Sequence, residues 1–389
     1  MSASLPSAAR AASRDLARTP LDALHRSLGA RMIEFAGYAL PVQYPSGIIS
    51  EHLHTRARAS LFDVSHMGQA VLAGLDAARR LESLVPADIT GLAPGRIRYT
   101  QFLDSEGHFL DDLMVTRIAG NSGDERFRLV VNAAFKAADF AHLQAHLPDC
   151  ALTILEDQAL LAFQGPFAAR ILARCLPPAY SGRVMTMPFM SAIDIEQNGI
   201  AMTLSRSGYT GEDGFEISLP GAMAESFARK LLSIPDVRPA GLGARNSLRL
   251  EAGLCLSGHD IDATTGPVEA GLLWSIPRRR RKEGGFLGYE GVKRALERGP
   301  ALLRTGFLME GKVSAREGAM VLDVAGQAAG RITSGSYAPS LGRAIAMGYA
   351  APEHAVPGTQ LRVTERGKEI AAAAAPMPFV PHRYFRGVL

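Results

Sequence analysis

The chain has 389 residues, of which 47% are hydrophobic and 21% charged, and its formal net charge is +4. Such a composition is typical of a globular enzyme, and the length allows two or three domains. The charge is too small for a chain of this size to indicate nucleic-acid binding, and no apolar run is long enough to span a membrane. The three cysteines, at positions 150, 175 and 255, lack CxxC spacing, so the sequence predicts neither a zinc site nor a disulfide framework.

Residues 1–18 form a leader that is rich in Ala, Ser and Arg and carries a single acid, Asp15. This composition fits a mitochondrial transit peptide, but it also fits an irregular bacterial N-terminus. We favour the second interpretation, which predicts a cytoplasmic protein, whereas the first predicts the mitochondrial matrix. Under both interpretations the leader is predicted to be flexible.

The folded part of the chain is predicted to begin with a helix at Thr19. Thr19 can cap this helix, Pro20 suits its first turn, and Gly29 can end it. Short extended segments then alternate with amphipathic helices. The hydrophobic spacing places these helices at about residues 76–84, 135–146, 166–175, 222–233 and 243–251. Strands and helices mixed in this way, many joined by tight glycine turns, predict an α+β region over residues 19–285.

The pattern changes after residue 300. From residue 304 to residue 380 the chain consists of short segments with alternating polar and apolar residues, such as "RTGFLME" and "RAIAMGYA", separated by frequent glycines. This stretch predicts a small antiparallel β-barrel or sandwich. We place the C-terminal domain at residues 300–384.

Two adjacent carboxylates interrupt an apolar strand in "HFLDDLMVTRI", residues 108–118. Successive side chains on a strand point to opposite faces, so Asp111 and Asp112 cannot share one face. At least one of them enters an apolar layer, where a carboxylate is costly unless another group pairs with it or the chemistry uses it.

Three glycines spaced three apart, Gly208, Gly211 and Gly214, precede a strand in "SRSGYTGEDGFEISL". A turn of this kind lets the backbone come close to a flat ligand. Glu216 lies at the start of the strand, and its carboxylate could accept two parallel N–H bonds from an amidine-like edge such as that of a pterin. The alternative is an ordinary hairpin with solvated acids.

The helix predicted at residues 243–251 follows a glycine-rich turn, but Asn246 leaves the GxGxxG dinucleotide pattern incomplete. Arg245 lies in the first turn, where the helix dipole disfavours a cation, so an anionic partner is expected. A salt bridge from Arg245 or Arg249 to Glu251 along the same helix is the simplest arrangement.

The histidines do not form a metal-binding motif. His142 and His146 have helical i, i+4 spacing, but no glutamate motif accompanies them, so no metal is expected. His66 is expected to be a hydrogen-bonded core residue, and Cys255 a buried apolar one.

Several segments together resemble one family. "LFDVSHMGQ", "DDLMVTRI", "GYTGEDGFEI", "GARNSLRLEAGLCLSGHDID" and "ITSGSYAPSLGRAIAMGYA" are similar, in this order, to the T-protein aminomethyltransferases of the glycine cleavage system. The similarity runs from Thr19 to about Tyr384. Its departures are small, since Asn246 stands where the family usually has Asp, and Tyr38 where Trp is common.

The resemblance implies a three-lobed fold closed around a central channel, with a C-terminal barrel. It also implies a reaction in which a carrier, the lipoylated H-protein, delivers an aminomethyl group. Ammonia is released, and the one-carbon unit passes to the co-substrate tetrahydrofolate to give 5,10-methylenetetrahydrofolate. The enzyme would work together with the glycine decarboxylase and dihydrolipoyl dehydrogenase components of the system.

The resemblance also assigns roles to particular residues. By resemblance, Asp112, the second acid of the pair, matches the family's catalytic acid. The reaction needs such a group, because a fixed anion stabilises a cationic iminium and a base takes protons from folate nitrogens. Asp111 then faces away as a structural acceptor. The residues that match the family's folate contacts are Tyr99, Val131, Asn132, Tyr209, Glu216, Arg245 and Tyr384.

Other proteins share this fold. A folate-dependent demethylase, or the folate-binding half of a sarcosine-type oxidase, would take its one-carbon unit from another donor. A folate-binding protein that maintains iron–sulphur enzymes would carry a Lys-Gly-Cys-Tyr-x-Gly-Gln-Glu signature. This chain reads "GLCLSGHD" at that place, so the flanking residues of the signature are missing.

The basic run "PRRRRKE", residues 277–283, has three interpretations. It could be a solvated linker between domains. It could instead contact the polyglutamate tail of cellular folate. The third interpretation is a docking site for the carrier, which in this family is typically acidic, because a basic patch would attract it.

Overall fold

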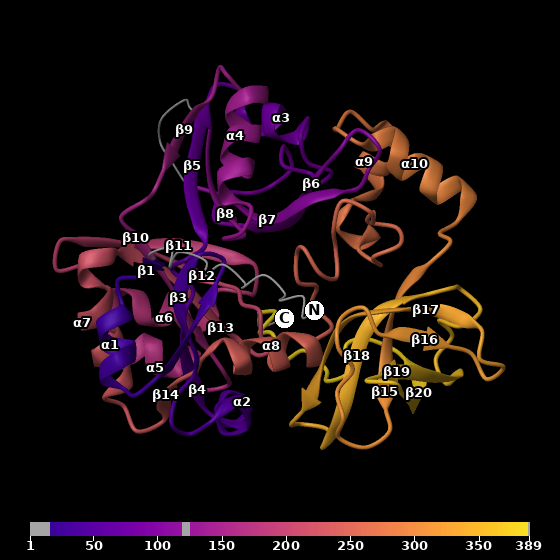
Figure 1. The fold of residues 1–389 in the computed structure, drawn as a ribbon. Coiled ribbons are helices and arrows are strands. Elements are labelled where there is room, and N and C mark those ends of the chain that lie inside the picture. The colour runs from indigo at the N-terminus through magenta and orange to yellow at the C-terminus, as the bar shows by residue number, and fades with distance from the viewer. Residues whose placement is uncertain (1–15, 119–124, 388–389) are drawn as a thin grey trace, which may run out of the picture.

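The computed structural model describes residues 16–118 and 125–387, which fold into three lobes (Figure 1). Two lobes combine helices with sheets, and the third is a β-barrel. The chain begins the first lobe, leaves it to form the second, and returns to complete the first before it reaches the barrel. The predicted three-lobed α+β fold with a C-terminal antiparallel barrel is therefore confirmed.

The first lobe contains two sheets. A small sheet has the order β1-β3-β2, with β1 at Ala17–Arg18, β2 at Arg31–Phe35 and β3 at Tyr38–Gln43. The larger sheet has six strands in the order β11-β12-β13-β10-β4-β14. Its strands are β4 at Ala59–Asp63, β10 at Gln158–Gln164, β11 at Ser191–Gln197, β12 at Ile200–Arg206, β13 at Gly214–Pro220 and β14 at Val237–Pro239.

Five helices belong to this lobe. They are α1 at Asp22–Ser27, α2 at Ile48–Ala57, α5 at Ala168–Cys175, α6 at Pro178–Thr186 and α7 at Gly221–Leu232. In α5 the apolar residues recur at helical spacing, so Ala168, Ile171, Leu172 and Cys175 form one stripe that packs into the main core. The predicted cap of α1 is wrong, because the Thr19 hydroxyl donates instead to Asp63 Oδ2 at 2.6 Å.

The second lobe is a five-stranded antiparallel sheet in the order β6-β7-β8-β5-β9, covered on one face by two helices. Its strands are β5 at Gly68–Gly74, β6 at Ile97–Leu103, β7 at Phe109–Arg117, β8 at Glu125–Val131 and β9 at Ala151–Ile154; its helices are α3 at Ala77–Glu82 and α4 at Lys136–His146. Phe102, Leu113 and Phe127 fill the core on the helix-covered face.

Helix α8, Leu242–Glu251, lies where the first lobe meets the barrel (Figure 1). Its Leu248 packs into a first-lobe core, whereas Leu250 packs against Ile345 and Met347 of the barrel. The 3-10 turn η1 at Leu273–Ser275 and the helices α9 at Arg278–Glu283 and α10 at Tyr289–Arg298 follow. This segment packs on the second lobe, where the backbone N–H of Leu287 donates to the carbonyl of Ser83 at 2.9 Å.

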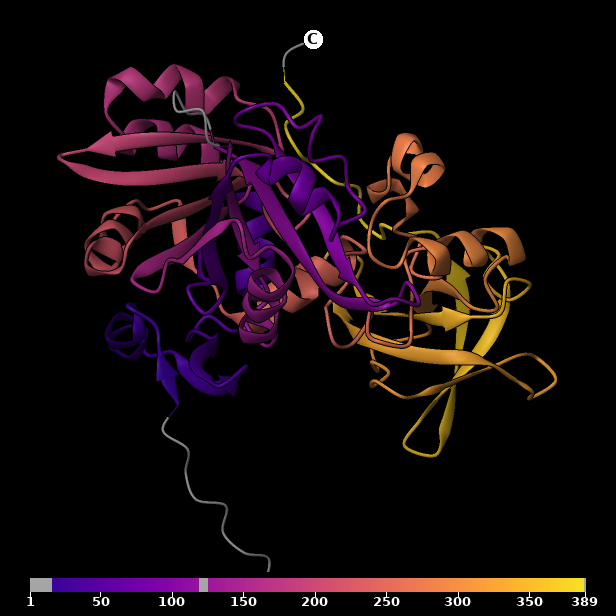
Figure 2. The same ribbon diagram turned by 90° about the horizontal axis from the view of Figure 1, so that it is seen from above.

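The barrel closes in the order β15-β18-β17-β16-β19-β20. Its strands are β15 at Leu303–Met309, β16 at Met320–Leu322, β17 at Ala328–Ala338, β18 at Arg343–Ala350, β19 at Gln360–Glu365 and β20 at Lys368–Ala375. The chain then leaves the barrel and crosses to the first lobe (Figure 2), where the backbone N–H of Arg383 donates to the Gly211 carbonyl at 2.8 Å.

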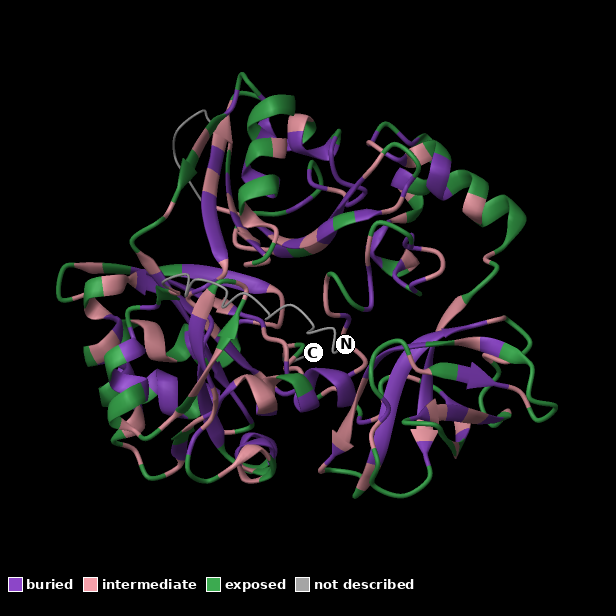
Figure 3. Cartoon of the chain, viewed as in Figure 1, coloured by how far each residue is buried: buried purple, intermediate pink, exposed green. Residues whose placement is uncertain are grey.

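Burial follows this architecture. The central strands of the six-stranded sheet, β4, β10 and β13, are mostly buried, and the outward faces of α4 and α10 are exposed (Figure 3). Within residues 16–118 and 125–387, no helix combines the length and apolarity that a membrane crossing needs.

Candidate active site

Strand β7 places the two adjacent acids on opposite faces of the five-stranded sheet. Asp111 pairs across the strands with Phe102, which lies in the core beneath the helices. Asp112 pairs with Gln101 and shares its face with Met114, which points toward the first lobe. This is the alternation that the sequence predicts.

Asp111 is fully buried and acts as a hydrogen-bond acceptor. Its Oδ1 accepts from the Ser257 hydroxyl at 2.5 Å and from Asn132 Nδ2 at 2.9 Å. Its Oδ2 accepts from the backbone N–H of Asn132 at 3.3 Å. These donors offset the desolvation of a buried carboxylate.

Asp112 is half-buried and is held by the same amide group. Asn132 Nδ2 donates to Asp112 Oδ1 at 2.5 Å, so one NH₂ group lies between the two acids. Burial, and after it the charge of Asp111, raises the pKa of Asp112 to about 7, while hydrogen bonds from Tyr99 and Asn132 oppose this rise. A carboxyl group with a pKa near neutrality can hold or accept a proton at physiological pH.

Aromatic rings connect this acid to the surface. Tyr99 faces Asp112 and stacks on Trp274, with ring centroids 5.5 Å apart and planes at 22°. Trp274 is 68% exposed. Tyr209 donates its hydroxyl hydrogen to the carbonyl of Cys255. Burial raises the pKa of both tyrosines and raises the pKa of the Cys255 thiol to about 12, so these three groups are neutral at physiological pH.

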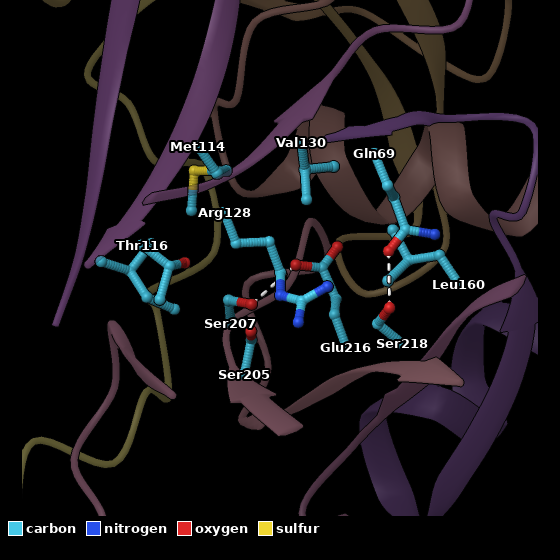
Figure 4. A pocket seen from close by; sticks show the side chains of 11 residues that line it. Gln69, Met114, Thr116, Arg128, Val130, Leu160, Ser205, Ser207, Glu216 and Ser218 are labelled. Carbon is cyan, nitrogen blue, oxygen red and sulfur yellow. Dashed lines mark hydrogen bonds between the residues drawn. The ribbon is translucent and has the colours of Figure 1, made fainter. Parts of the chain in front are cut away.

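A small cavity of about 20 Å³ lies between the sheets of the first and second lobes (Figure 4). The second lobe contributes Met114, Arg128 and Val130, and the first lobe contributes Ser207 and Glu216. The Ser207 hydroxyl donates to Glu216 Oε2 at 2.6 Å. Among the described residues, none donates to the other carboxylate oxygen of Glu216, so this acid can accept from a further group.

Two arginines offer donors near this carboxylate. Arg128 Nε and Arg245 Nη1 are buried, and neither has a hydrogen-bond partner in the described part of the chain. Arg245 lies over the ring of Tyr209, 4.7 Å from its centroid, and Glu216 is its principal acidic neighbour. A buried donor without a partner costs about 1–3 kcal/mol, so these nitrogens suit a polar ligand.

A larger cavity of about 410 Å³ opens where the first lobe, α8 and the barrel meet. Phe35 and Tyr209 line it from the first lobe, Arg245 and Asn246 from α8, and Ser334 from the barrel. Its volume lies in the range of small-molecule sites. Arg245 and Tyr209 therefore border a space large enough for a ligand that extends beyond the small cavity.

Of the predicted folate contacts, four line neither cavity: Tyr99, Val131, Asn132 and Tyr384. Asp112 also lines neither cavity, and Tyr99 and Asn132 contact it instead. Val131 pairs with Leu113 and points into the core of the second lobe, whereas its neighbour Val130 lines the small cavity. A shift of one residue along a strand moves a side chain to the opposite face. Tyr384 stacks on Phe189, with centroids 3.9 Å apart, and is not among the residues that line either cavity.

The acids of the glycine-rich turn are paired and not solvated. Glu212 is buried and accepts from Arg56 Nη1 at 3.0 Å, and Asp213 accepts from Arg206 Nη2 at 2.6 Å. The alternative of an ordinary hairpin with solvated acids is therefore wrong. The two ion pairs hold the turn that carries Tyr209.

The expected salt bridge along α8 is also wrong. Glu251 accepts instead from Arg56 Nη2 at 2.9 Å, and Arg249 donates to Asp260 Oδ2 at 2.6 Å. Helix α8 is buried between a lobe and the barrel, so its charges pair with other elements and not along the helix. Arg245 is consequently left available for the site.

His66 is buried as expected, but its Nδ1 has no hydrogen-bond partner among the described residues. Burial, followed by the charge of Arg245, lowers the pKa of His66 to about 4, so it is neutral. The rings of His142 and His146 lie 4.3 Å apart. In the described residues no group of three or more His, Cys, Asp or Glu side chains could hold a metal ion.

Sequence reasoning missed Arg128 and Trp274. Arg128 lies two residues before Val130, so the period-two pattern of β8 places both on one face, but only the packing of the two sheets shows that this face meets Glu216. Trp274 is the single tryptophan of the chain. Its exposed position beside Tyr99 could not be predicted from the sequence.

The site combines a carboxyl group whose pKa is raised to about 7 with two cavities lined by acidic and basic side chains. Residues 21–280 match the GCVT N-terminal domain family, and residues 304–381 match the glycine cleavage T-protein C-terminal barrel domain family. The mitochondrial aminomethyltransferase of Gallus gallus is 43% identical over 378 residues, which cover 95% of this chain and 94% of that protein. That of Solanum tuberosum is 41% identical, covering 97% and 93%.

A solved structure gives the same result. The crystal structure of glycine cleavage system aminomethyltransferase T from Bartonella henselae has a TM-score of 0.89 and 41% sequence identity, and the match covers 95% of this chain and 100% of that one. The chain belongs to the glycine cleavage T-protein family of aminomethyltransferases. The demethylase and iron–sulphur alternatives are not favoured, because the curated relatives named here are aminomethyltransferases.

Proposed function

We propose that this enzyme transfers the one-carbon unit of an aminomethyl group from the lipoyl arm of an H-protein to tetrahydrofolate, with release of ammonia. The observation that carries the proposal is Asp112, a half-buried acid whose pKa is raised to about 7 on a strand face that meets the first lobe. The products are 5,10-methylenetetrahydrofolate and the dihydrolipoyl carrier.

Asp112 supplies negative charge and a proton acceptor to this reaction. The aminomethyl carbon becomes positively charged as its bond to sulphur breaks, and a fixed anion nearby lowers the energy of that charge. The accepting nitrogens must also lose protons as they bond to carbon, and a carboxylate with a pKa near 7 can take one. Asn132 holds Asp112 in place, and Tyr99 covers it.

The folate site extends from Glu216 to the larger cavity. Glu216 accepts from the amino and ring N–H groups of the pterin, and Arg128 and Arg245 supply the donors that have no partner in the described residues. Tyr209 packs beside the ring system, and the remainder of the folate extends into the larger cavity along α8. Val131 and Tyr384 are proposed to contribute only through their backbone or through their neighbours.

The carrier is proposed to dock beside α9. Arg278, Arg281 and Lys282 of this helix are exposed, and they lie close in sequence to the exposed ring of Trp274. Trp274 stacks on Tyr99, which faces Asp112, so the surface is two rings away from the acid. The H-protein also links the enzyme to the glycine decarboxylase and dihydrolipoyl dehydrogenase components, in the bacterial cytoplasm or the mitochondrial matrix.

The proposal is tested with purified protein, aminomethylated H-protein and tetrahydrofolate. Ammonia and 5,10-methylenetetrahydrofolate should appear together, in equal amounts, and only when all three components are present. Methylated donors such as sarcosine or dimethylglycine should not replace the carrier. Product formation from those donors, or ammonia release without the folate product, would show that the reaction is a different one.

A further inference from the structure

A third carboxyl group lies behind the two acids of β7. Asp139 is in the first turn of α4 and is only 4% exposed, and Asp111 is its principal acidic neighbour. Its Oδ2 is buried, and no N–H or hydroxyl group of the described residues donates to it. Two carboxylates that face each other in a buried site repel strongly unless a proton lies between them.

We propose that Asp139 is a positioning residue that donates its carboxyl hydrogen to Asp111 and thereby fixes the negative charge beside Asp112. This inference rests on the proposed function, because it explains how the catalytic acid acquires its basicity. Asp139 itself does not reach the reacting atoms, and it acts through Asp111 and Asn132.

Hydrogen bonds connect Asp111 to Asp112 through Asn132, and Asp139 neighbours Asp111. Asp139 meets Asp111, and Asp111 accepts from Asn132 Nδ2 at 2.9 Å and from Ser257 at 2.5 Å. The same Asn132 Nδ2 donates to Asp112 at 2.5 Å. If Asp111 lost its charge, the electrostatic field at Asp112 would change, and so would the strength of the hydrogen bond that Asn132 donates to Asp111.

Neutral and charged groups surround this cluster, and the charged ones, Arg249, Asp260 and Arg304, lie around Tyr209 and Cys255. The titratable groups that face it are Tyr99 from β6, Tyr209 from the glycine-rich turn and Cys255 from the segment after α8, all neutral at physiological pH. On α4, burial lowers the pKa of His142, and Lys136 binds Tyr38 and the carbonyl of His66 instead.

Burial, followed by the charges of Asp111 and Asp112, raises the pKa of Asp139 to about 9. Asp139 therefore holds a proton across the physiological range. The charge of Asp111 is in turn one cause of the raised pKa of Asp112. A retained proton one layer behind the site thus sets the pH at which Asp112 becomes a base.

The test compares Asp139→Leu with Asp139→Asn. In the Leu variant Asp111 loses the hydrogen bond proposed from Asp139 and keeps those from Ser257 and Asn132, so it is expected to place less negative charge beside Asp112. The acidic limb of the kcat–pH profile should then shift downward by about one pH unit. The Asn variant keeps a neutral hydrogen-bond donor for Asp111, so the acidic limb of its kcat–pH profile should stay at the wild-type pH. A purely structural role would lower Tm in the Leu variant and leave its limb unmoved, which would overturn the proposal.

Infrared spectroscopy gives a readout that needs neither activity nor a stable Leu variant. At about pH 8, where Asp112 is mostly ionised, the wild-type protein should show the C=O stretch of a buried protonated carboxyl group. Asp139→Asn should lack this band. If the band were absent in the wild type, or unchanged in Asp139→Asn, the proposal would be wrong even if the enzyme transfers one-carbon units as proposed.

Discussion

Asp111 and Asp112 are neighbours in the chain, yet the two faces of β7 give them different chemistry. Asp111 receives three donors in a fully buried site, whereas Asp112 keeps a pKa of about 7 at the edge of the lobe. Strand periodicity alone predicted that the two acids separate. It could not predict that Asn132 donates to both acids, because this contact depends on the pairing of β8 with β7, which places Asn132 beside them.

The carboxylate of Glu216 gives a direct prediction for binding. Glu216→Gln replaces one acceptor oxygen with an N–H group that opposes the donors of a pterin edge. Losing a charge-assisted bond of this kind costs about 1.5–3 kcal/mol, so Kd for a reduced folate should rise roughly 10- to 100-fold, with a smaller effect on turnover of bound substrate. Calorimetry measures this. Glu196→Gln, on an exposed strand position of the same lobe, is the control, and an unchanged Kd for Glu216→Gln would remove Glu216 from the site.

The raised pKa of Asp112 predicts a pH-dependent effect on stability. A carboxyl group whose folded pKa is about 7 instead of the ordinary 3.8 favours the folded state below pH 3.8, and this contribution is lost as the pH rises through 7. Asp112→Asn removes the buried charge, so it should raise Tm by roughly 2 °C at about pH 8 and leave it nearly unchanged at about pH 4. Scanning calorimetry at both values checks this. A lower Tm at the higher pH would mean that Asp112 is a structural anion.

At the scale of elements, apolar spacing located most helices within about two residues. Helix α2 was not predicted, because its buried face is polar. The buried residues of this face are Glu51, His52, Thr55 and Arg56. A helix that buries ion pairs has no apolar stripe to detect. The barrel strands were easier, since alternation and glycine turns mark them. Arg56 then positions the glycine-rich turn through Glu212, a contact that no local pattern contains.

The basic side chains of α9 fall into two groups, those that contact the second lobe and those that are exposed. Arg279 donates to Asp88 at 2.8 Å and pairs with Glu82, and Arg280 donates to the backbone carbonyl of Glu82. These two arginines attach α9 to the second lobe. The interpretation of the whole run as a solvated linker is therefore wrong for them, and only the exposed Arg278, Arg281 and Lys282 are available to a partner.

Replacing Arg278, Arg281 and Lys282 together with Ser should weaken carrier docking. The apparent KM for aminomethylated H-protein should rise several-fold at low salt and approach the wild-type value at high salt, because surface charges are screened. The KM for monoglutamyl folate should stay constant. Initial-rate kinetics at two ionic strengths measure both.

The matched control replaces three exposed barrel cations, Lys312, Arg366 and Lys368, with Ser. This variant removes the same charge from another surface. An equal rise of KM in both variants would indicate a general charge effect and would exclude α9 as the docking site. Arg279→Ser should instead lower Tm, because it breaks the attachment of α9.

At the scale of the whole molecule, residue patterns predicted an α+β region followed by a barrel, but not how the lobes interleave. The first lobe is completed by strands from both sides of the second lobe in sequence, and no local signal encodes that pairing. The three-lobed arrangement was expected only from the resemblance to a family. The site depends on it, because Asp112, Glu216 and Arg245 come from the second lobe, the first lobe and α8.

The most direct test of the account compares the wild type, Asp112→Asn and Asp111→Asn in the coupled assay with aminomethylated H-protein and tetrahydrofolate at about pH 8. Asp112→Asn should remain folded by circular dichroism and lose activity by about 10²–10⁴-fold in both ammonia and methylenetetrahydrofolate formation. Asp111→Asn should lose far less rate and show its cost in Tm. Equal losses of rate in two folded variants would contradict the assignment of Asp112 as the catalytic acid.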